Sequence, residues 1–192
     1  MQEYGRILLP VPNKLAVIIL NWRIINMDFK DQPFIPMLFG GDINTYSVAR
    51  AFYEEYQVKT YVFGKFPSGP SYNSNIIEYH ADLKIDTDDV FMKTVRDFAA
   101  AHADKTVLTI GCGDSYVALC SRHKDEMPEN VVAPYIDFEL MDRLQQKELF
   151  YRLCREHDID FPDTLVFRYG MDLDFELPFS FPVILKPSNS VM

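Results

Sequence analysis

The sequence contains little of what defines several common protein classes. Its three cysteines, Cys112, Cys120 and Cys154, are an odd number without CxxC spacing. This pattern argues against a disulfide framework or a zinc knuckle and favours reduced thiols. The longest uninterrupted apolar run, residues 15–20, is much shorter than the roughly 20 residues that a membrane-spanning helix needs. We therefore expect a cytoplasmic protein without a signal peptide and without a membrane partner.

Basic residues are also scarce. Lysine and arginine total 19 against 28 aspartates and glutamates, which gives a formal net charge of −9. A chain this acidic repels the phosphate backbone of nucleic acids, so we expect no nucleic-acid partner. A small anion is still compatible with this charge, because local groups dominate the field at a few ångströms. The four histidines are isolated in sequence and show no spacing typical of a metal site.

Apolar residues, by contrast, are plentiful enough for a substantial core. They make up 48% of the 192 residues and include 15 phenylalanines and 11 tyrosines. A buried aromatic side chain removes a large apolar area from water. The length allows one large domain, or a medium domain and part of a second.

Apolar periodicity predicts alternating strands and helices from residue 34 onward. The segment 43–56 repeats apolar residues at spacings of three and four after Asp42, a favourable N-cap. Residues 64–85 are rich in turn-forming residues and read as a loop with one short strand. The alternation favours an α/β fold with a mainly parallel sheet. The strands are expected at 34–39, 60–63, 107–110, 131–133, 164–167 and 182–186, and the helices at 43–56, 86–103, 114–124 and 137–157.

The chain divides into three parts on this pattern. Residues 1–30 are assigned to an N-terminal extension, because the first 26 have no clear helical period. Their short apolar runs leave open that they are extra strands of the domain, and either Met1 or Met27 is compatible as the native start. Residues 31–136 form the α/β domain, and residues 137–192 begin a second unit.

Two glycine-containing turns join a predicted strand to a predicted helix. The first, at residues 39–44, places Gly40, Gly41 and Asp42 where the carboxyl end of a strand meets a helix N-terminus. Such a junction is suited to anions, although the GxGxxG fingerprint is absent and a structural turn with a cap explains the same residues. The second, at residues 111–115, contains Cys112, for which a packing turn is favoured over a nucleophile.

Two lysines complete the set of candidate residues. Lys186 ends a predicted apolar strand and is followed by a small polar segment, where backbone N–H groups can fold over phosphates. Lys147 lies in the predicted helix over 137–157. Taken singly, each lysine is compatible with an ordinary solvent-exposed charge.

Taken in order, three of these segments resemble the ATP-grasp superfamily, and within it the carboxylate–amine ligases of the D-aspartate ligase and carbamoyl-phosphate-synthase-like kind. Residues 34–52 resemble the opening strand, glycine turn and first helix of that family. Residues 146–164 resemble its segment of a lysine, a helix and a Pro-x-Thr strand, and residues 181–187 resemble its second lysine strand. The resemblance covers the chain from about residue 30 to its last residue.

The resemblance implies a Rossmann-like pre-ATP-grasp domain over 31–136, followed by the incomplete start of an ATP-grasp lobe. It also implies ATP and Mg²⁺ as cofactors, with the Mg²⁺ ligands expected in a missing C-terminal part. It further implies a carboxylate and an amine as small-molecule substrates, joined through an acyl phosphate. The residues that match positions contacting ATP phosphates are Lys147, Lys186, Ser188, Asn189 and Ser190. The residues that match the turn facing the acceptor substrate are Gly40, Gly41, Asp42 and Asn44.

One departure from the family concerns magnesium. The acidic and asparagine ligands that the family uses for Mg²⁺ have no counterpart before Met192. We therefore expect the chain to be an N-terminal fragment without ligase activity of its own. A non-catalytic α/β binding or interaction module, an unrelated doubly wound enzyme and a homodimer stay open as alternatives.

Overall fold

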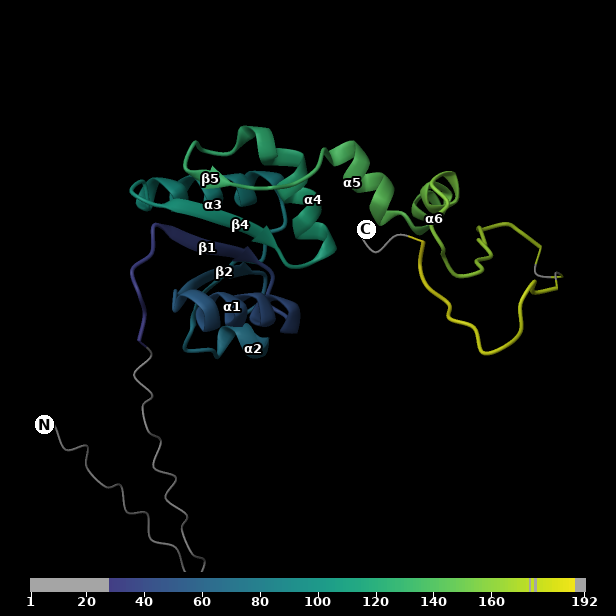
Figure 1. Cartoon of the computed structure of the whole chain (residues 1–192), viewed down its shortest axis with the longest axis horizontal. Coiled ribbons are helices and arrows are strands. Elements are labelled where there is room, and N and C mark those ends of the chain that lie inside the picture. The colour runs from purple at the N-terminus through teal and green to yellow at the C-terminus, as the bar shows by residue number, and fades with distance from the viewer. Residues whose placement is uncertain (1–27, 173, 175, 189–192) are drawn as a thin grey trace, which may run out of the picture.

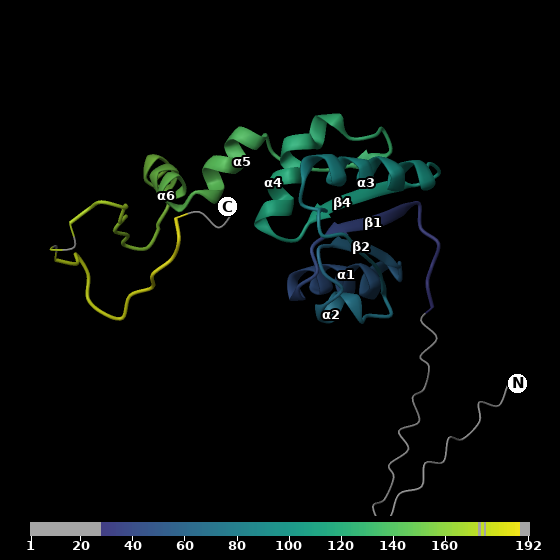
Figure 2. The same cartoon turned by 180° about the vertical axis from the view of Figure 1, so that it is seen from behind.

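A computed structural model describes residues 28–172, 174 and 176–188 of the chain. Within these residues five parallel strands form one sheet in the order β3-β2-β1-β4-β5. Helices cover both of its faces (Figures 1 and 2). The strands are β1 (Phe34–Phe39), β2 (Thr60–Gly64), β3 (Ile77–Ala81), β4 (Thr106–Gly111) and β5 (Val131–Val132). This arrangement confirms the predicted α/β, Rossmann-like fold with a parallel sheet.

The helices follow the strands as the sequence predicts. A 3₁₀ turn, η1 (Lys124–Glu126), extends α4. The helix expected over 137–157 forms as two separate helices. The helices are α1 (Ile43–Tyr56), α2 (Gly69–Tyr72), α3 (Asp88–Ala101), α4 (Asp114–His123), α5 (Phe138–Gln145) and α6 (Lys147–Glu156).

The central strand β1 is buried on both faces. Residues 37–39 pair with residues 61–63 of β2, and all of β1 pairs with 106–111 of β4. Met37, Leu38 and Phe39 have no exposed surface. A strand with apolar residues on both faces requires helices on each side, because either face left in water would lose the stabilisation from burial.

Alternating side chains of β1 enter two separate cores. Phe39 packs with Phe91 of α3 and other residues of α3 and α4 on one face, and the Phe39 and Phe91 ring centroids are 4.6 Å apart. Leu38 packs with Ala49 of α1 and Val62 of β2 on the other. The sequence period of two in the strand thus divides the sheet into an α3–α4 face and an α1 face.

Residues 136–145 pack on the surface of α4. The Ser121 hydroxyl donates to the Ile136 carbonyl oxygen at 2.7 Å, and Lys124 pairs with Asp137 at 2.8 Å. The side-chain amide of Gln145 donates to the backbone oxygen of Asp114 at 2.8 Å. These contacts hold α5 against α4. The predicted domain boundary at residue 137 stays a prediction.

Two predicted strands are wrong, and one helix was missed. Residues 164–167 and 182–186 are not strands in the structure, because a strand needs a hydrogen-bonding partner and neither segment has one within the described residues. The short helix α2 begins after Ser68 with Gly69 and Pro70, which read as loop residues in the sequence. The expected extension falls largely on residues 1–27, which lie outside the described residues. The described part of the chain contains no helix long and apolar enough to cross a membrane.

The double-sided burial of β1 predicts a large difference between two leucines. Leu38→Ala should lower the free energy of unfolding by about 2–5 kcal/mol, because it leaves a cavity in a core that is closed to water. Leu83→Ala, at a leucine that is 65% exposed, is the matched control and should change it by less than about 0.5 kcal/mol. Urea denaturation followed by circular dichroism measures both. Equal losses would contradict the assigned core.

Candidate functional site

The candidate site lies at the carboxyl edge of the sheet, where β1 and β4 end side by side. The strand order reverses between these two strands, and ligands in open α/β sheets bind at such a reversal. The backbone N–H of Gly40 donates to the Phe63 oxygen at 2.9 Å, and that of Cys112 donates to the Phe39 oxygen at 2.8 Å. Both glycine turns singled out in the sequence therefore meet at this edge.

The glycines at this edge allow close approach of neighbouring groups. Gly40 has a φ of +145°, and a Cβ there would lie 2.3 Å from the Thr45 hydroxyl oxygen. A Cβ on Gly64 would lie 2.0 Å from the Tyr79 hydroxyl oxygen and 2.3 Å from the Gly40 carbonyl oxygen. Larger residues would force the turn apart, so glycine is a packing requirement at both positions.

Asp42 and Asn44 use their side chains for the helix cap. One carboxylate oxygen of Asp42 accepts from the backbone N–H groups of Asn44 at 3.0 Å and Thr45 at 3.1 Å, and from the Thr45 hydroxyl at 3.2 Å. The side-chain amide of Asn44 donates to the other oxygen at 3.1 Å. The cap satisfies the first N–H groups of α1. Asp42 and Asn44 are both solvent-exposed, and their predicted role in substrate binding stays a prediction.

Residues far away in sequence complete this edge. The Tyr79 hydroxyl donates to the Phe66 backbone oxygen at 2.8 Å, and burial raises the pKa of this phenol. The buried Ser71 hydroxyl donates to the Asp42 backbone oxygen at 3.2 Å. Sequence reasoning missed both residues, because they come from α2 and β3 and only the folded chain brings them to the turn.

Cys112 is a free, half-buried cysteine whose side chain packs within the turn. Burial raises the pKa of its thiol to about 11, and the nearby Asp42 carboxylate adds to this shift, whereas a hydrogen bond with Thr45 offsets part of it. Such a thiol carries little thiolate near neutral pH. The adjacent Gly111 N–H donates to the Tyr135 hydroxyl at 2.7 Å, which fastens the turn to the segment before α5. The preference for a packing turn over a nucleophile agrees with this environment.

The two lysine-bearing segments meet at one backbone contact. The N–H of Lys147, the first residue of α6, donates to the carbonyl oxygen of Ser188 at 3.1 Å. Lys186 lies two residues before Ser188 and is solvent-exposed, and Lys147 is half-buried. Lys147 and Ser188, which are 41 positions apart in sequence, are therefore in contact. Asn189 and Ser190, also predicted to contact phosphates, lie outside the described residues.

The described residues include two cationic side chains on segments in contact, but no cluster of metal-ligating side chains. Two cationic side chains on segments that touch are compatible with an oligophosphate. Within residues 28–172, 174 and 176–188 no group of three or more His, Cys, Asp or Glu residues is arranged to hold a metal ion. The described residues therefore supply no Mg²⁺ site made of such side chains alone.

Comparison with known proteins gives one informative relationship. The chain is 40% identical to D-aspartate ligase of Enterococcus faecium (strain Aus0004) over 169 residues, which cover 84% of this chain. The chain spans 40% of the length of that relative. No family model matches the chain. No solved structure matches it either.

The capping geometry predicts a specific loss of stability at Asp42. Asp42→Ala should lower the free energy of unfolding by about 1 kcal/mol, because the first N–H groups of α1 lose their acceptor. Asp42→Ser, which retains a capping oxygen, should recover most of this loss. Thermal and urea unfolding measure both variants. An alanine variant as stable as the parent would show that the cap contributes nothing.

The environment of Cys112 predicts slow thiol chemistry. A pKa near 11 in place of 9.0 leaves about 100-fold less thiolate at pH 8, because each unit is a tenfold change. The alkylation rate of Cys112 by iodoacetamide should therefore rise about tenfold per pH unit up to about pH 9.5 without reaching a plateau. Mass spectrometry of the alkylated peptide, with Cys112→Ser as the blank, measures this rate. A plateau near pH 8 would indicate an activated thiol instead.

Proposed function

We propose, from the relationship to D-aspartate ligase, that this chain provides the α/β domain and the first part of the nucleotide-binding lobe of an ATP-dependent carboxylate–amine ligase. The match confirms the resemblance to the ATP-grasp carboxylate–amine ligases that the sequence motifs indicate. The observation that carries the proposal is 40% identity over 84% of the chain. The parallel sheet in the order 3-2-1-4-5 supports it independently of the identity.

Lys147 and Lys186 are proposed to bind the phosphates of ATP. Phosphoryl transfer requires positioned cations more than covalent protein groups, because charge is spread over the phosphate oxygens in the transition state. ATP supplies the phosphoryl group that activates a carboxylate as an acyl phosphate, which an amine then attacks. The backbone contact between Lys147 and Ser188 supports this role, since it keeps the two lysine segments together. Ser188, Asn189 and Ser190 are proposed to begin the loop over the phosphates.

The turn at Gly40, Gly41, Asp42 and Asn44 is proposed to face the acceptor substrate. It stands at the carboxyl edge of β1 beside the β4 turn, which is the usual place for a ligand in this type of sheet. Backbone groups are the proposed contacts, because the side chains of Asp42 and Asn44 already bond to each other and to α1. The name of the relative points to an acidic amino acid as one substrate.

The 192 residues by themselves are proposed to bind nucleotide without completing ligation. The support is that they span 40% of the length of the relative, and that the described residues contain no cluster of three or more His, Cys, Asp or Glu residues arranged for a metal ion. A second candidate function is a non-catalytic α/β module that binds a ligand through the same sheet edge. The reversal of strand order between β1 and β4 favours this alternative, because ligands in open α/β sheets bind there whether or not a reaction follows.

Nucleotide protection tests the role of the two lysines. ATP should slow the acetylation of Lys147 and Lys186 by an amine-reactive reagent, because bound phosphates neutralise and cover both ammonium groups. Lys84, an exposed lysine of the α/β domain, is the control and should react at an unchanged rate. Quantitative mass spectrometry of the labelled peptides measures all three. Equal reactivity with and without saturating ATP would contradict the proposal and leave the binding module as the better description.

A further inference from the structure

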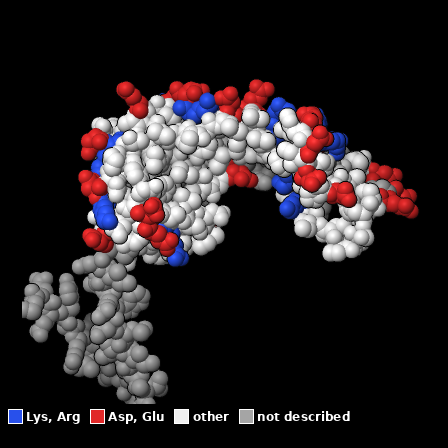
Figure 3. Space-filling model, in the orientation of Figure 1, with Lys and Arg blue, Asp and Glu red and all other residues white. Residues whose placement is uncertain are grey.

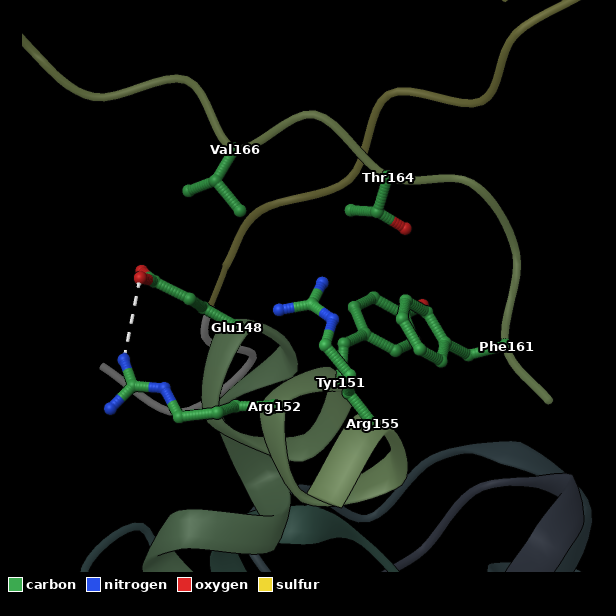
Figure 4. A pocket seen from close by; sticks show the side chains of 7 residues that line it. All are labelled: Glu148, Tyr151, Arg152, Arg155, Phe161, Thr164 and Val166. Atoms are coloured by element: carbon green, nitrogen blue, oxygen red, sulfur yellow. Dashed lines mark ion pairs between the residues drawn. The ribbon is translucent and has the colours of Figure 1, made fainter. Parts of the chain in front are cut away.

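A small cavity lies between α6 and the segment 161–166, outside the proposed lysine and acceptor sites. Its volume is about 270 Å³, and both charged and aromatic side chains line it. Figure 4 shows the Arg155 guanidinium between Glu148 on one side and the rings of Tyr151 and Phe161 on the other. Glu148, Tyr151 and Arg155 occur at helical spacing, so one face of α6 presents them together.

The basic groups around this cavity outnumber the acidic ones. Glu148 pairs with Arg168 and also lies 3.8 Å from Arg152. Arg155 makes no ion pair within the described part of the chain, and its guanidinium carbon lies 5.5 Å from the Phe161 ring centroid. Two guanidinium groups thus share the Glu148 carboxylate, and that of Arg155 has no carboxylate partner among the described residues. This local excess of positive charge contrasts with the net charge of −9 of the chain, whose acidic side chains are scattered along the outline of the visible face (Figure 3).

The opposite side of the cavity is an aromatic wall. The Tyr151 and Phe161 rings stack with centroids 5.4 Å apart and planes inclined by 20°. Thr164 lies above these rings, and Val166 adds an apolar side chain on the Glu148 side of the cavity (Figure 4). A guanidinium next to an aromatic wall suits an anion that carries an apolar group, because the oxygens take the N–H donors while the apolar part leaves water.

We propose that this cavity binds a small organic oxyanion, a carboxylate or a phosphate monoester, whose oxygens pair with Arg155 and whose apolar part lies along Tyr151 and Phe161. Arginine is suited to this role, since its planar fork matches two oxygens of one anion. The site is separate from Lys147 and Lys186 in its lining residues and in the ligand it selects, so it extends the proposed function without depending on it.

Phenyl phosphate is the probe, with inorganic phosphate and benzoate as separate arms. In the full chain, phenyl phosphate should shift the Arg155 Nε–H resonance in nitrogen–proton NMR spectra and bind about threefold or more tightly than inorganic phosphate, because only the former contacts the aromatic wall. Benzoate distinguishes a carboxylate ligand from a phosphate ligand. A shift with either organic anion supports the proposal. If neither phenyl phosphate nor benzoate shifts the resonance at about 10 mM, the dissociation constant lies far above that concentration and the proposal is overturned.

Matched variants test the assigned contacts. Arg155→Gln should weaken phenyl phosphate binding about tenfold, while Arg155→Lys, which keeps the charge, should lose less. Glu148→Gln should strengthen binding about threefold, because it removes a carboxylate at the cavity that repels the anion. Tyr151→Leu should reduce the preference for phenyl phosphate over inorganic phosphate.

The controls are an arginine elsewhere and a lysine of the proposed ATP site. Arg96→Gln alters an arginine of α3 that is as exposed as Arg152 and should leave the affinity unchanged. Lys147→Gln should also leave it unchanged, which separates this site from the proposed function. Equal loss in Arg155→Gln and Arg96→Gln would show nonspecific attraction of the anion and overturn the proposal. A weaker complex in Glu148→Gln would do the same.

Discussion

The structure depends on the burial of β1 between two neighbouring strands and two layers of helices. Because Met37, Leu38 and Phe39 are closed to solvent, side chains on both faces of the strand need cover, and α1 supplies it on one face while α3 and α4 supply it on the other. The same constraint fixes where the strand ends. Gly40 emerges beside Cys112 at the reversal of strand order, so the packing of the core determines the position of the candidate site.

The fold could be predicted from sequence wherever the pattern was local. The helix over 43–56 was predicted at its observed bounds, because Asp42 caps it and its apolar residues follow a helical period. The segments 164–167 and 182–186 have equally apolar sequences but do not form strands. Apolar character alone does not decide strand formation, since pairing supplies the hydrogen bonds. Ile184 and Leu185 are 82% and 95% exposed, which shows that nothing in the described residues covers this apolar segment.

The candidate site was also predictable where it depends on a local sequence pattern. The glycines at 40 and 41 and the cap at Asp42 follow from the junction of a strand with a helix. Tyr79 and Tyr135 could not be predicted in this way. Their hydroxyls reach the two turns through contacts between segments that are remote in sequence. The pairing of Lys147 with the segment of Ser188 likewise joins positions remote in sequence. The sequence connects these two lysines only through the family resemblance, because nothing local to either segment indicates the contact.

The contact between the Lys147 and Lys186 segments is the feature on which the proposed nucleotide site rests. Treatment with a short amine-reactive cross-linker, followed by peptide mass spectrometry, tests this most directly. The account predicts that Lys186 links to Lys147 in preference to Lys93, which lies on α3. Cross-links from Lys186 distributed without preference between these two lysines, or none to Lys147, would contradict it.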